Sequence, residues 1–302
     1  MPSPPPFAVL LLASGGPGGP EEVESFLTEM RGGPPAPAEL ATMRQRLQRA
    51  GGRSLVPEIT EAQRVALSRE VGTPVYAGMR HGRPSIAETV ERIVADGQHR
   101  VVGLVMAPHY SAVTVGDAER TLIAAAKGRL ELGLVRAWGD HIAFLRAVEH
   151  HVRQALQRFD APRKVPVIFT GPSIPQRVAR RGDPYPEQLR DSAAAIAGRL
   201  RVTTWHVAYH RPPDPVEPWL DPDPAEVLAR LAGEGYRDVL VVPLGWVTDQ
   251  VEIQYDVDVD YRERAAALGL RLERTSSLND DPDLIQCLSQ LARAEAAERE
   301  WV

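Results

Sequence analysis

The sequence predicts an α/β fold made of two similar halves, each with a parallel sheet flanked by helices and with a cleft between them. Short apolar, β-branched runs alternate with longer helical patterns along the chain, as in consecutive βαβ units. The same plan appears before and after a proline-containing crossover at residues 160–166. We therefore expect an N-terminal domain over residues 1–160 and a C-terminal domain over residues 161–302, with the last helix free to pack back on the first domain.

The first half opens on a buried strand, residues 7–13, that ends in a glycine- and proline-rich turn. Pro20 in this turn favours a helix that starts at Glu21. The turn does not match the GxGxxG dinucleotide fingerprint. Thr60 is a candidate helix cap. The further strands of this half are expected at residues 74–79, 101–107 and 132–137, and the helices at residues 21–30, 38–50, 60–70, 85–95, 116–126 and 142–159.

The second half is organised around a β-branched run, residues 239–242, that stops at a proline as a central parallel strand does. A polar turn then leads into a helix on which Glu252, Asp256 and Asp260 fall at i, i+4 and i+8 and share one face. Ligands of open α/β sheets bind at this edge. The alternative is a solvated acidic face. The other strands are expected at residues 167–170, 202–209 and 270–273, the helices at residues 186–200, 225–233 and 282–297, and a proline-rich loop at residues 211–218.

Composition excludes several classes of protein. A net charge of −5 over 302 residues argues against a nucleic-acid binder, which needs a basic surface. The single cysteine, Cys287, excludes a disulfide framework and any Cys-ligated zinc or iron–sulfur site, and it suits the cytoplasm. No apolar run reaches about 18 residues, so we expect no integral membrane segment. The sequence does not indicate the oligomeric state.

Several motifs resemble those of the ferrochelatase family, in the same order along nearly the whole chain. GPSIP (171–175) and GDPYPEQ (182–188) are similar to the family patterns SAHS[IL]P and GDPYxxQ. PWL (218–220) matches the family's PWL, and PLGWVTDQVEIQYD (243–256) is similar to P[IV]GFV[SA]DHLExxYD. APHYS (107–111) and residues 51–63 resemble the bacterial, coproporphyrin-type branch, whose NDDP is also present at residues 279–282.

The resemblance implies a chelatase-like fold of two Rossmann-like domains that hold a tetrapyrrole, either haem or a porphyrin, in the cleft. The family reaction inserts Fe²⁺ into a porphyrin and releases two pyrrole protons. By this resemblance Glu252 is the central acidic residue, with Asp256 and Asp260 guiding metal or protons behind it. The residues expected to bind the tetrapyrrole are Ser14, Arg31, His81, His109, Tyr110, Ser111, Pro172, Ser173, Trp219 and Gln250, and those expected to bind metal are Glu252, Asp256, Asp260 and His109.

The centre of the expected site departs from the family pattern. Pro172 stands where the family has its central histidine, and proline has no side-chain base. Gln250 replaces the histidine of DHLE with an amide that does not titrate near neutral pH. Ser14 replaces an aromatic residue, and the loop at Arg31 keeps one arginine where relatives have several.

Two histidines without a family counterpart, His206 and His210, lie on the strand before PWL. Residues four apart in a strand share a face. His210 is at the strand's carboxyl end, which makes it a candidate acid/base group or axial haem ligand; a hydrogen-bonded loop histidine is the alternative. The predicted catalytic residues are therefore Glu252, His210 and Asp256.

These departures favour a protein that binds haem or a porphyrin and has been repurposed for a haem-dependent biosynthetic reaction on a small-molecule substrate. A working ferrochelatase, in which Glu252 and another group replace the missing histidine, is the first alternative. A non-enzymatic haem carrier is the second. A chelatase for another metal, or a protein with a non-porphyrin ligand, is the third.

Overall fold

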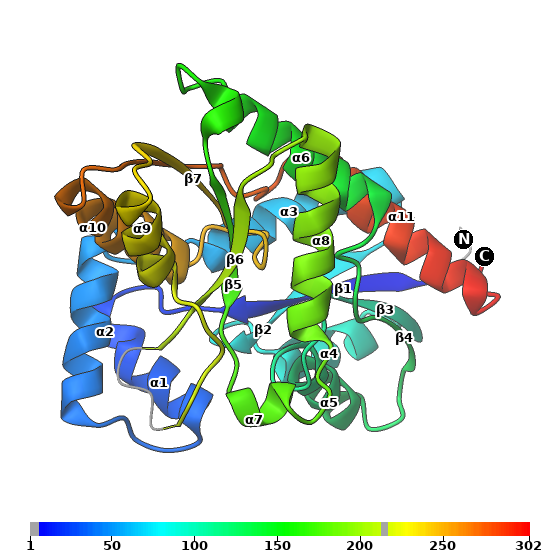
Figure 1. Cartoon of the computed structure of the whole chain (residues 1–302). Coiled ribbons are helices and arrows are strands. Elements are labelled where there is room, and N and C mark those ends of the chain that lie inside the picture. Colours follow the sequence, from blue (N-terminus) through cyan, green and yellow to red (C-terminus); the bar gives the residue numbers. More distant parts are fainter. Residues whose placement is uncertain (1–5, 213–216) are drawn as a thin grey trace.

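Two parallel four-stranded sheets form the frame of the protein and confirm the predicted α/β fold class (Figure 1). The computed structural model describes residues 6–212 and 217–302, so residues 213–216 of the expected proline-rich loop lie outside the described residues. The first sheet has the order β2-β1-β3-β4, with β1 (Ala8–Gly15), β2 (Val75–His81), β3 (Arg100–Val105) and β4 (Glu131–Val135). The second has the order β6-β5-β7-β8, with β5 (Val167–Pro172), β6 (Trp205–His210), β7 (Asp238–Val242) and β8 (Arg271–Arg274).

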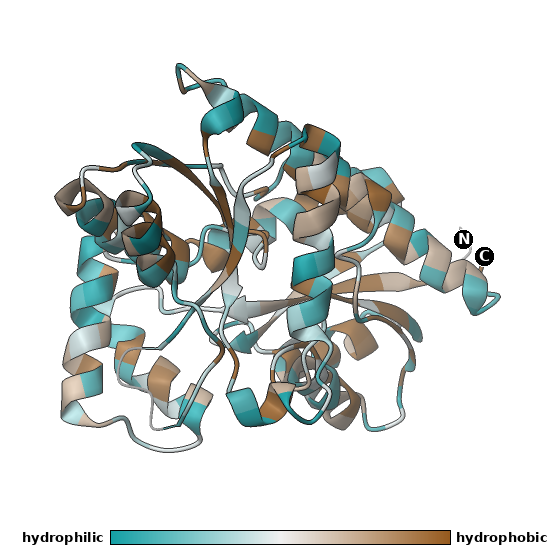
Figure 2. Cartoon of the chain, viewed as in Figure 1, coloured by the Kyte–Doolittle hydropathy of each residue, from teal (hydrophilic) through white to brown (hydrophobic). Residues whose placement is uncertain are grey.

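The strand β1 is buried on both faces, as a central parallel strand must be. Because successive side chains of a strand point to opposite faces, Val9 and Leu11 enter one hydrophobic cluster, while Leu10 and Leu12 enter another. Figure 2 accordingly shows β1 and β7 mostly in shades of brown, the hydrophobic end of its scale.

The helices cover both sheets, and their bounds agree with the predicted ones to within a few residues in most cases. Thr60 is a correction: α3 begins at Val56, so Thr60 is buried inside the helix and does not cap it. In residues 6–212 and 217–302 no helix is long and apolar enough to span a bilayer. The bounds are α1 (Val23–Arg31), α2 (Pro37–Arg49), α3 (Val56–Val71), α4 (Ile86–Ala95), α5 (Val115–Ala126), α6 (Ile142–Leu156), α7 (Gln176–Ala179), α8 (Tyr185–Leu200), α9 (Pro224–Gly233), α10 (Arg262–Ala267), α11 (Pro282–Glu298), the short 3₁₀-helices η1 (Pro20–Glu22) and η2 (Pro162–Lys164), and the π-helix η3 (Glu252–Tyr261).

Two helices cross between the halves. Helix α11, which ends the chain, packs against α3, β3 and β4 of the first half, and Figure 1 shows it well apart from α9 and α10. Helix α6, which follows the first sheet, packs against α8 and β7 of the second half. One buried cluster consequently includes Leu11 of β1, Phe169 of β5 and Leu288 of α11. The division into domains at residue 160 stays a prediction, because the two halves share this core.

The order of the strands indicates at which edge of each sheet a ligand would bind. In the first sheet β2 lies on one side of β1, and β3 and β4 lie on the other, so the order of connection reverses between β1 and β3. In the second sheet it reverses between β5 and β7 in the same way. Open α/β sheets bind their ligands outside the carboxyl ends of the strands at such a point. The carboxyl ends of β1, β5, β6 and β7 carry Ser14, Pro172, His210 and the loop before Glu252.

Candidate functional site

The loop after β7 lies directly against the end of β5, and two glycines make this possible. A Cβ atom on Gly245 would lie 2.6 Å from the Cα atom of Gly171 and 2.8 Å from Pro172 Cδ. Real Cβ atoms do not approach other atoms this closely, so only glycine fits at residue 245. The Tyr185 hydroxyl donates a hydrogen bond of 2.7 Å to the Pro172 carbonyl oxygen and fixes the same corner from α8.

A polar network holds the loop from residue 248 to residue 250. The Asp249 carboxylate accepts hydrogen bonds from Ser277 Oγ at 2.8 Å and from Asn279 Nδ2 at 2.9 Å. The Asn279 Oδ1 atom accepts a bond of 3.0 Å from the Asp249 N–H. Arg274 bridges Asp249, at 3.2 Å, and Asp258, at 2.7 Å, so both the loop and η3 are tied to the end of β8.

The acidic segment after this loop is a π-helix, η3, over Glu252–Tyr261. The sequence predicted an α-helix here, and that prediction is wrong. A π-helix closes i→i+5 hydrogen bonds, is rare, and is frequently found at functional sites. The expected single acidic face is divided among different environments. Asp260 pairs with Arg264 at 2.9 Å, whereas Asp256 turns into the protein.

The Glu252 side chain is exposed to water, and neighbouring protein atoms still desolvate its carboxyl group. Desolvation by the surrounding atoms raises the pKa of its carboxyl group, and the Asp256 charge raises it further, against the opposing charges of Arg46 and His210. A carboxyl group with a raised pKa accepts a proton more readily than an ordinary carboxylate does.

Asp256 is the centre of a buried charge cluster that joins the two halves. Its Oδ1 atom pairs with the Arg46 guanidinium, which reaches it from α2 in the first half. Its Oδ2 atom lies 3.2 Å from Nδ1 of His210, at the end of β6. The attraction of Asp256 and Glu252 raises the pKa of Arg46 although desolvation opposes it. Both carboxylate oxygens are therefore engaged, and the geometry gives no support to Asp256 as a metal ligand.

His210 is held in one orientation with one free nitrogen. Its side chain is 2 % exposed, and its ring packs edge-on with Trp246 at 4.8 Å and Tyr261 at 5.2 Å between ring centroids. The Asp256 carboxylate accepts from Nδ1, which assigns the proton to Nδ1 and leaves the lone pair on Nε2. The Nε2 atom is buried and has no hydrogen-bond partner.

A family model described as Ferrochelatase matches residues 6–296 of the chain. A ferrochelatase of Herpetosiphon aurantiacus is 36 % identical over 300 residues, which cover 95 % of this chain and 98 % of that protein. A ferrochelatase of Thermus thermophilus is also 36 % identical, over 311 residues, with 95 % and 98 % covered. A coproporphyrin III ferrochelatase of Halalkalibacterium halodurans is 30 % identical over 305 residues, with 97 % and 98 % covered.

The chain belongs to the ferrochelatase family. Among solved structures, the sirohydrochlorin chelatase SirB of Bacillus subtilis subspecies spizizenii, in complex with cobalt, resembles it with a TM-score of 0.62, 13 % identity, and 97 % and 96 % of the two chains covered. CbiX, described as the terminal enzyme of sirohaem biosynthesis in denitrifying bacteria, has a TM-score of 0.57, 14 % identity, and 95 % and 98 % covered. At these identities the likeness establishes the chelatase fold.

The structure of this ferrochelatase-family chain brings several predicted residues to the same edge. Ser14, at the end of β1, donates a hydrogen bond of 3.3 Å to the side-chain oxygen of Gln250, so the two halves meet there. Ser173 donates its N–H to the His210 carbonyl at 2.9 Å and its hydroxyl to the Leu220 carbonyl at 3.1 Å. Trp219 is half-buried and pairs with Pro175 in an isolated β-bridge beside them.

Other predicted residues lie in different surroundings. His109 is buried and bonds through Nε2 to Ser192 Oγ at 2.9 Å. The Tyr110 N–H donates to Gln188 Oε1 at 2.7 Å, and the Ser111 hydroxyl donates to Asp183 at 3.0 Å. This tripeptide therefore anchors the end of β3 to α8. Its proposed contact with a tetrapyrrole or metal stays a prediction.

Arg31 ends α1, and His81 ends β2. Arg31 pairs with Glu39 at the surface. His81 packs edge-on against Phe26, with ring centroids 6.1 Å apart, and desolvation lowers its pKa, with the Arg80 charge acting in the same direction. Their roles in binding stay predictions as well.

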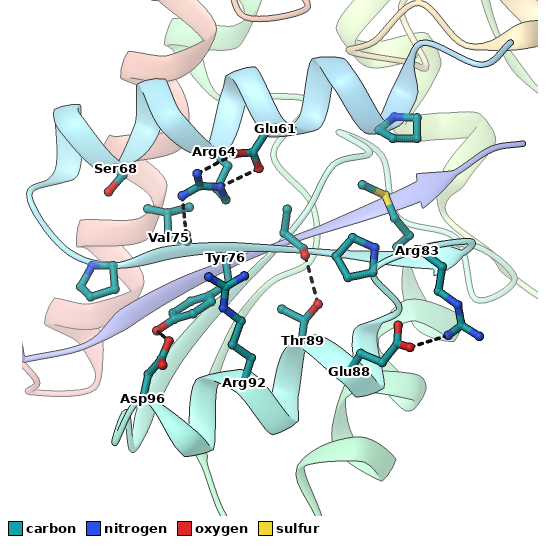
Figure 3. Close-up of a pocket in the computed structure, with 15 residues that line it drawn as sticks. Glu61, Arg64, Ser68, Val75, Tyr76, Arg83, Glu88, Thr89, Arg92 and Asp96 are labelled. Carbon is teal, nitrogen blue, oxygen red and sulfur yellow. Dashed lines mark hydrogen bonds and ion pairs between the residues drawn. The ribbon is translucent and has the colours of Figure 1, made fainter. Parts of the chain in front are cut away.

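A cavity of about 780 Å³ lies away from this edge, along β2 between α3 and α4 (Figure 3). Its charged groups pair with one another, Arg64 with Glu61 at 2.6 Å and Arg83 with Glu88 at 2.9 Å. No three His, Cys, Asp or Glu side chains in the described ranges come together as a metal-binding group. The edge that carries Glu252 and His210 is therefore the better candidate for a functional site.

Arg46 is the residue of the candidate site that sequence reasoning missed. Arginines on amphipathic helices are ordinarily surface residues whose stems cover apolar area. No local signal distinguishes Arg46 from the neighbouring arginines of α2, because its partner Asp256 lies 210 residues away in the sequence.

We predict that Arg46→Met lowers the free energy of unfolding by about 3–5 kcal/mol, because it leaves the Asp256 carboxylate buried with one partner. The double variant Arg46→Met/Asp256→Asn removes the uncompensated charge and should recover part of this loss. Urea denaturation of the wild type, both single variants and the double variant measures it. A double variant less stable than the wild type by the sum of the two single losses would contradict the pairing.

We also predict that His109 makes stability dependent on pH. Desolvation lowers its pKa from 6.5 to about 3, so the unfolded chain binds a proton that the folded protein does not. Stability falls as the pH drops from about 6.5 towards 3, by about 1.4 kcal/mol per pH unit. Urea denaturation between pH 7.5 and 5 gives the free energy of unfolding at each pH. This free energy should change less steeply with pH in His109→Gln than in the exposed control His99→Gln. Equal slopes would contradict the burial of His109 as a neutral ring.

Proposed function

We propose that this protein inserts ferrous iron into a porphyrin. The observation that carries the proposal is Glu252, a water-accessible carboxyl group with a raised pKa at the position of the family's central acidic residue. Relatives named ferrochelatase align with almost the whole chain, which supports metal insertion better than the repurposed haem-dependent reaction that the sequence alone favoured. The porphyrin and Fe²⁺ are then substrates and not resident cofactors.

The reaction requires two pyrrole N–H bonds to break while the nitrogen lone pairs bind iron. The iron stays in the +2 state, so no oxidant or reductant takes part, and two protons leave the ring. We infer that the Glu252 carboxylate accepts these protons. Its raised pKa supports the role, because a carboxyl group at its ordinary pKa would hold a pyrrole proton too weakly at neutral pH. The reducing compartment that the single cysteine favours also suits ferrous iron.

The surrounding residues supply position and charge balance. Arg46 lies close enough to Glu252 to lower its pKa, and Asp256 acts in the opposite direction. The network through Asp249 and Arg274 fixes the start of η3, and so the place of Glu252. Proton transfer depends steeply on such positioning. Ser14 and Gln250, which meet across the two halves, are proposed to contact the porphyrin face.

We predict that Glu252→Gln lowers the turnover number for iron insertion about 10²–10⁴-fold, because an amide cannot accept the pyrrole protons. Anaerobic assays with Fe²⁺ and either coproporphyrin III or protoporphyrin IX, followed by the loss of porphyrin fluorescence, measure it. Glu263→Gln, which changes an exposed carboxylate on α10, is the matched control and should retain the wild-type rate.

Two results would contradict the proposed function. Wild-type protein that does not exceed the uncatalysed rate with either porphyrin, while it binds haem with a stable Soret band, would favour the haem carrier or the repurposed enzyme. A Glu252→Gln variant as fast as the wild type would mean that the protein inserts iron without Glu252 as the proton acceptor.

A further inference from the structure

We propose that His210, oriented by Asp256, is the second proton acceptor of the reaction and does the work of the histidine that is absent at residue 172. This inference rests on the proposed function. It assigns a role to a residue outside the family motifs, on a strand next to the one that carries the altered signature.

The sheet register places His210 beside the altered position. On neighbouring parallel strands, Pro172 of β5 pairs with His210 of β6. Paired residues of adjacent strands are about 4.8 Å apart and point to the same face of a sheet. Ile168 and Ala208, which precede them by four and two residues, both belong to the hydrophobic cluster shared with η3. His210 therefore faces η3, on the side to which a histidine at residue 172 would also point.

The Asp256 carboxylate prepares His210 to accept a proton. It accepts from Nδ1 and is itself held by Arg46, so the ring is fixed and the Nε2 lone pair stays free. A buried nitrogen without a partner is energetically unfavourable. Trp246 and Tyr261 cover the ring and keep solvent from satisfying it. A buried polar atom without a partner calls for an explanation, and a catalytic role is one.

Glu252 connects this nitrogen to the porphyrin. Glu252 lies four residues before Asp256 on η3, and the Asp256 carboxylate lies 3.2 Å from His210 Nδ1. The first pyrrole N–H bond breaks and its proton forms an O–H bond on the Glu252 carboxylate. That proton then moves to Nε2 of His210, giving an imidazolium beside the Asp256 carboxylate. Glu252 is again a carboxylate and accepts the second proton, while Fe²⁺ takes the two freed lone pairs.

The test compares iron insertion by the wild type, His210→Ala, Asp256→Asn and the control His206→Ala, which changes a half-buried histidine on the same strand. We expect His210→Ala to lower the turnover number about 10²–10⁴-fold. Added imidazole should raise the turnover number of His210→Ala at least about tenfold, because it supplies the missing base. Porphyrin binding, measured by fluorescence, should stay at the wild-type level in all four proteins. His206→Ala should keep the wild-type rate.

Asp256→Asn should also slow the reaction, but imidazole should not restore it, because His210 is then present and wrongly oriented. Wild-type turnover in His210→Ala, or a slow His210→Ala that binds porphyrin and does not respond to imidazole, would overturn this inference and leave the proposed function intact. A wild-type protein without turnover above the uncatalysed rate would overturn both.

Discussion

The site depends on the pairing of the buried Asp256 carboxylate with Arg46 and His210. A buried charge costs several kcal/mol unless partners compensate it. One partner, Arg46, comes from α2 of the first half, and the other, His210, comes from the second sheet. The same contact therefore joins the halves and sets the tautomer of His210. Desolvation raises the pKa of Glu252, and the Asp256 charge raises it further, whereas Arg46 and His210 lower it. A change at any of these four residues is felt by the other three.

This cluster explains how a chain can keep the ferrochelatase frame without the central histidine of the family. Pro172 and Gln250 remove two bases from the expected positions, while Gly171 and Gly245 still allow the strand ends to meet. In our account the proton-accepting role has moved by one strand, to His210. The acidic residue it works with, Glu252, has stayed in place on the π-helix η3.

The sequence predicted much of the frame, because buried strands such as β1 and β7 are local apolar runs and the family motifs mark the loops after them. It also predicted Glu252 and His210 as catalytic. It did not predict the π-helix, because periodicity of apolar residues does not distinguish i→i+5 from i→i+4 bonding. Arg46 and the pairing of Pro172 with His210 depend on long-range contacts, which no local pattern records. His109 could be recognised as a strand-end histidine, but its burial against α8 depends on packing between the two halves.

The most direct test of the account is the rate of anaerobic iron insertion by the double variant Pro172→His/His210→Ala. If the proton acceptor has moved between two paired positions, a histidine at residue 172 should replace the one lost at residue 210. We predict that the double variant is at least about tenfold faster than His210→Ala alone. A double variant as slow as His210→Ala, when Pro172→His alone is folded and fully active, would contradict the account.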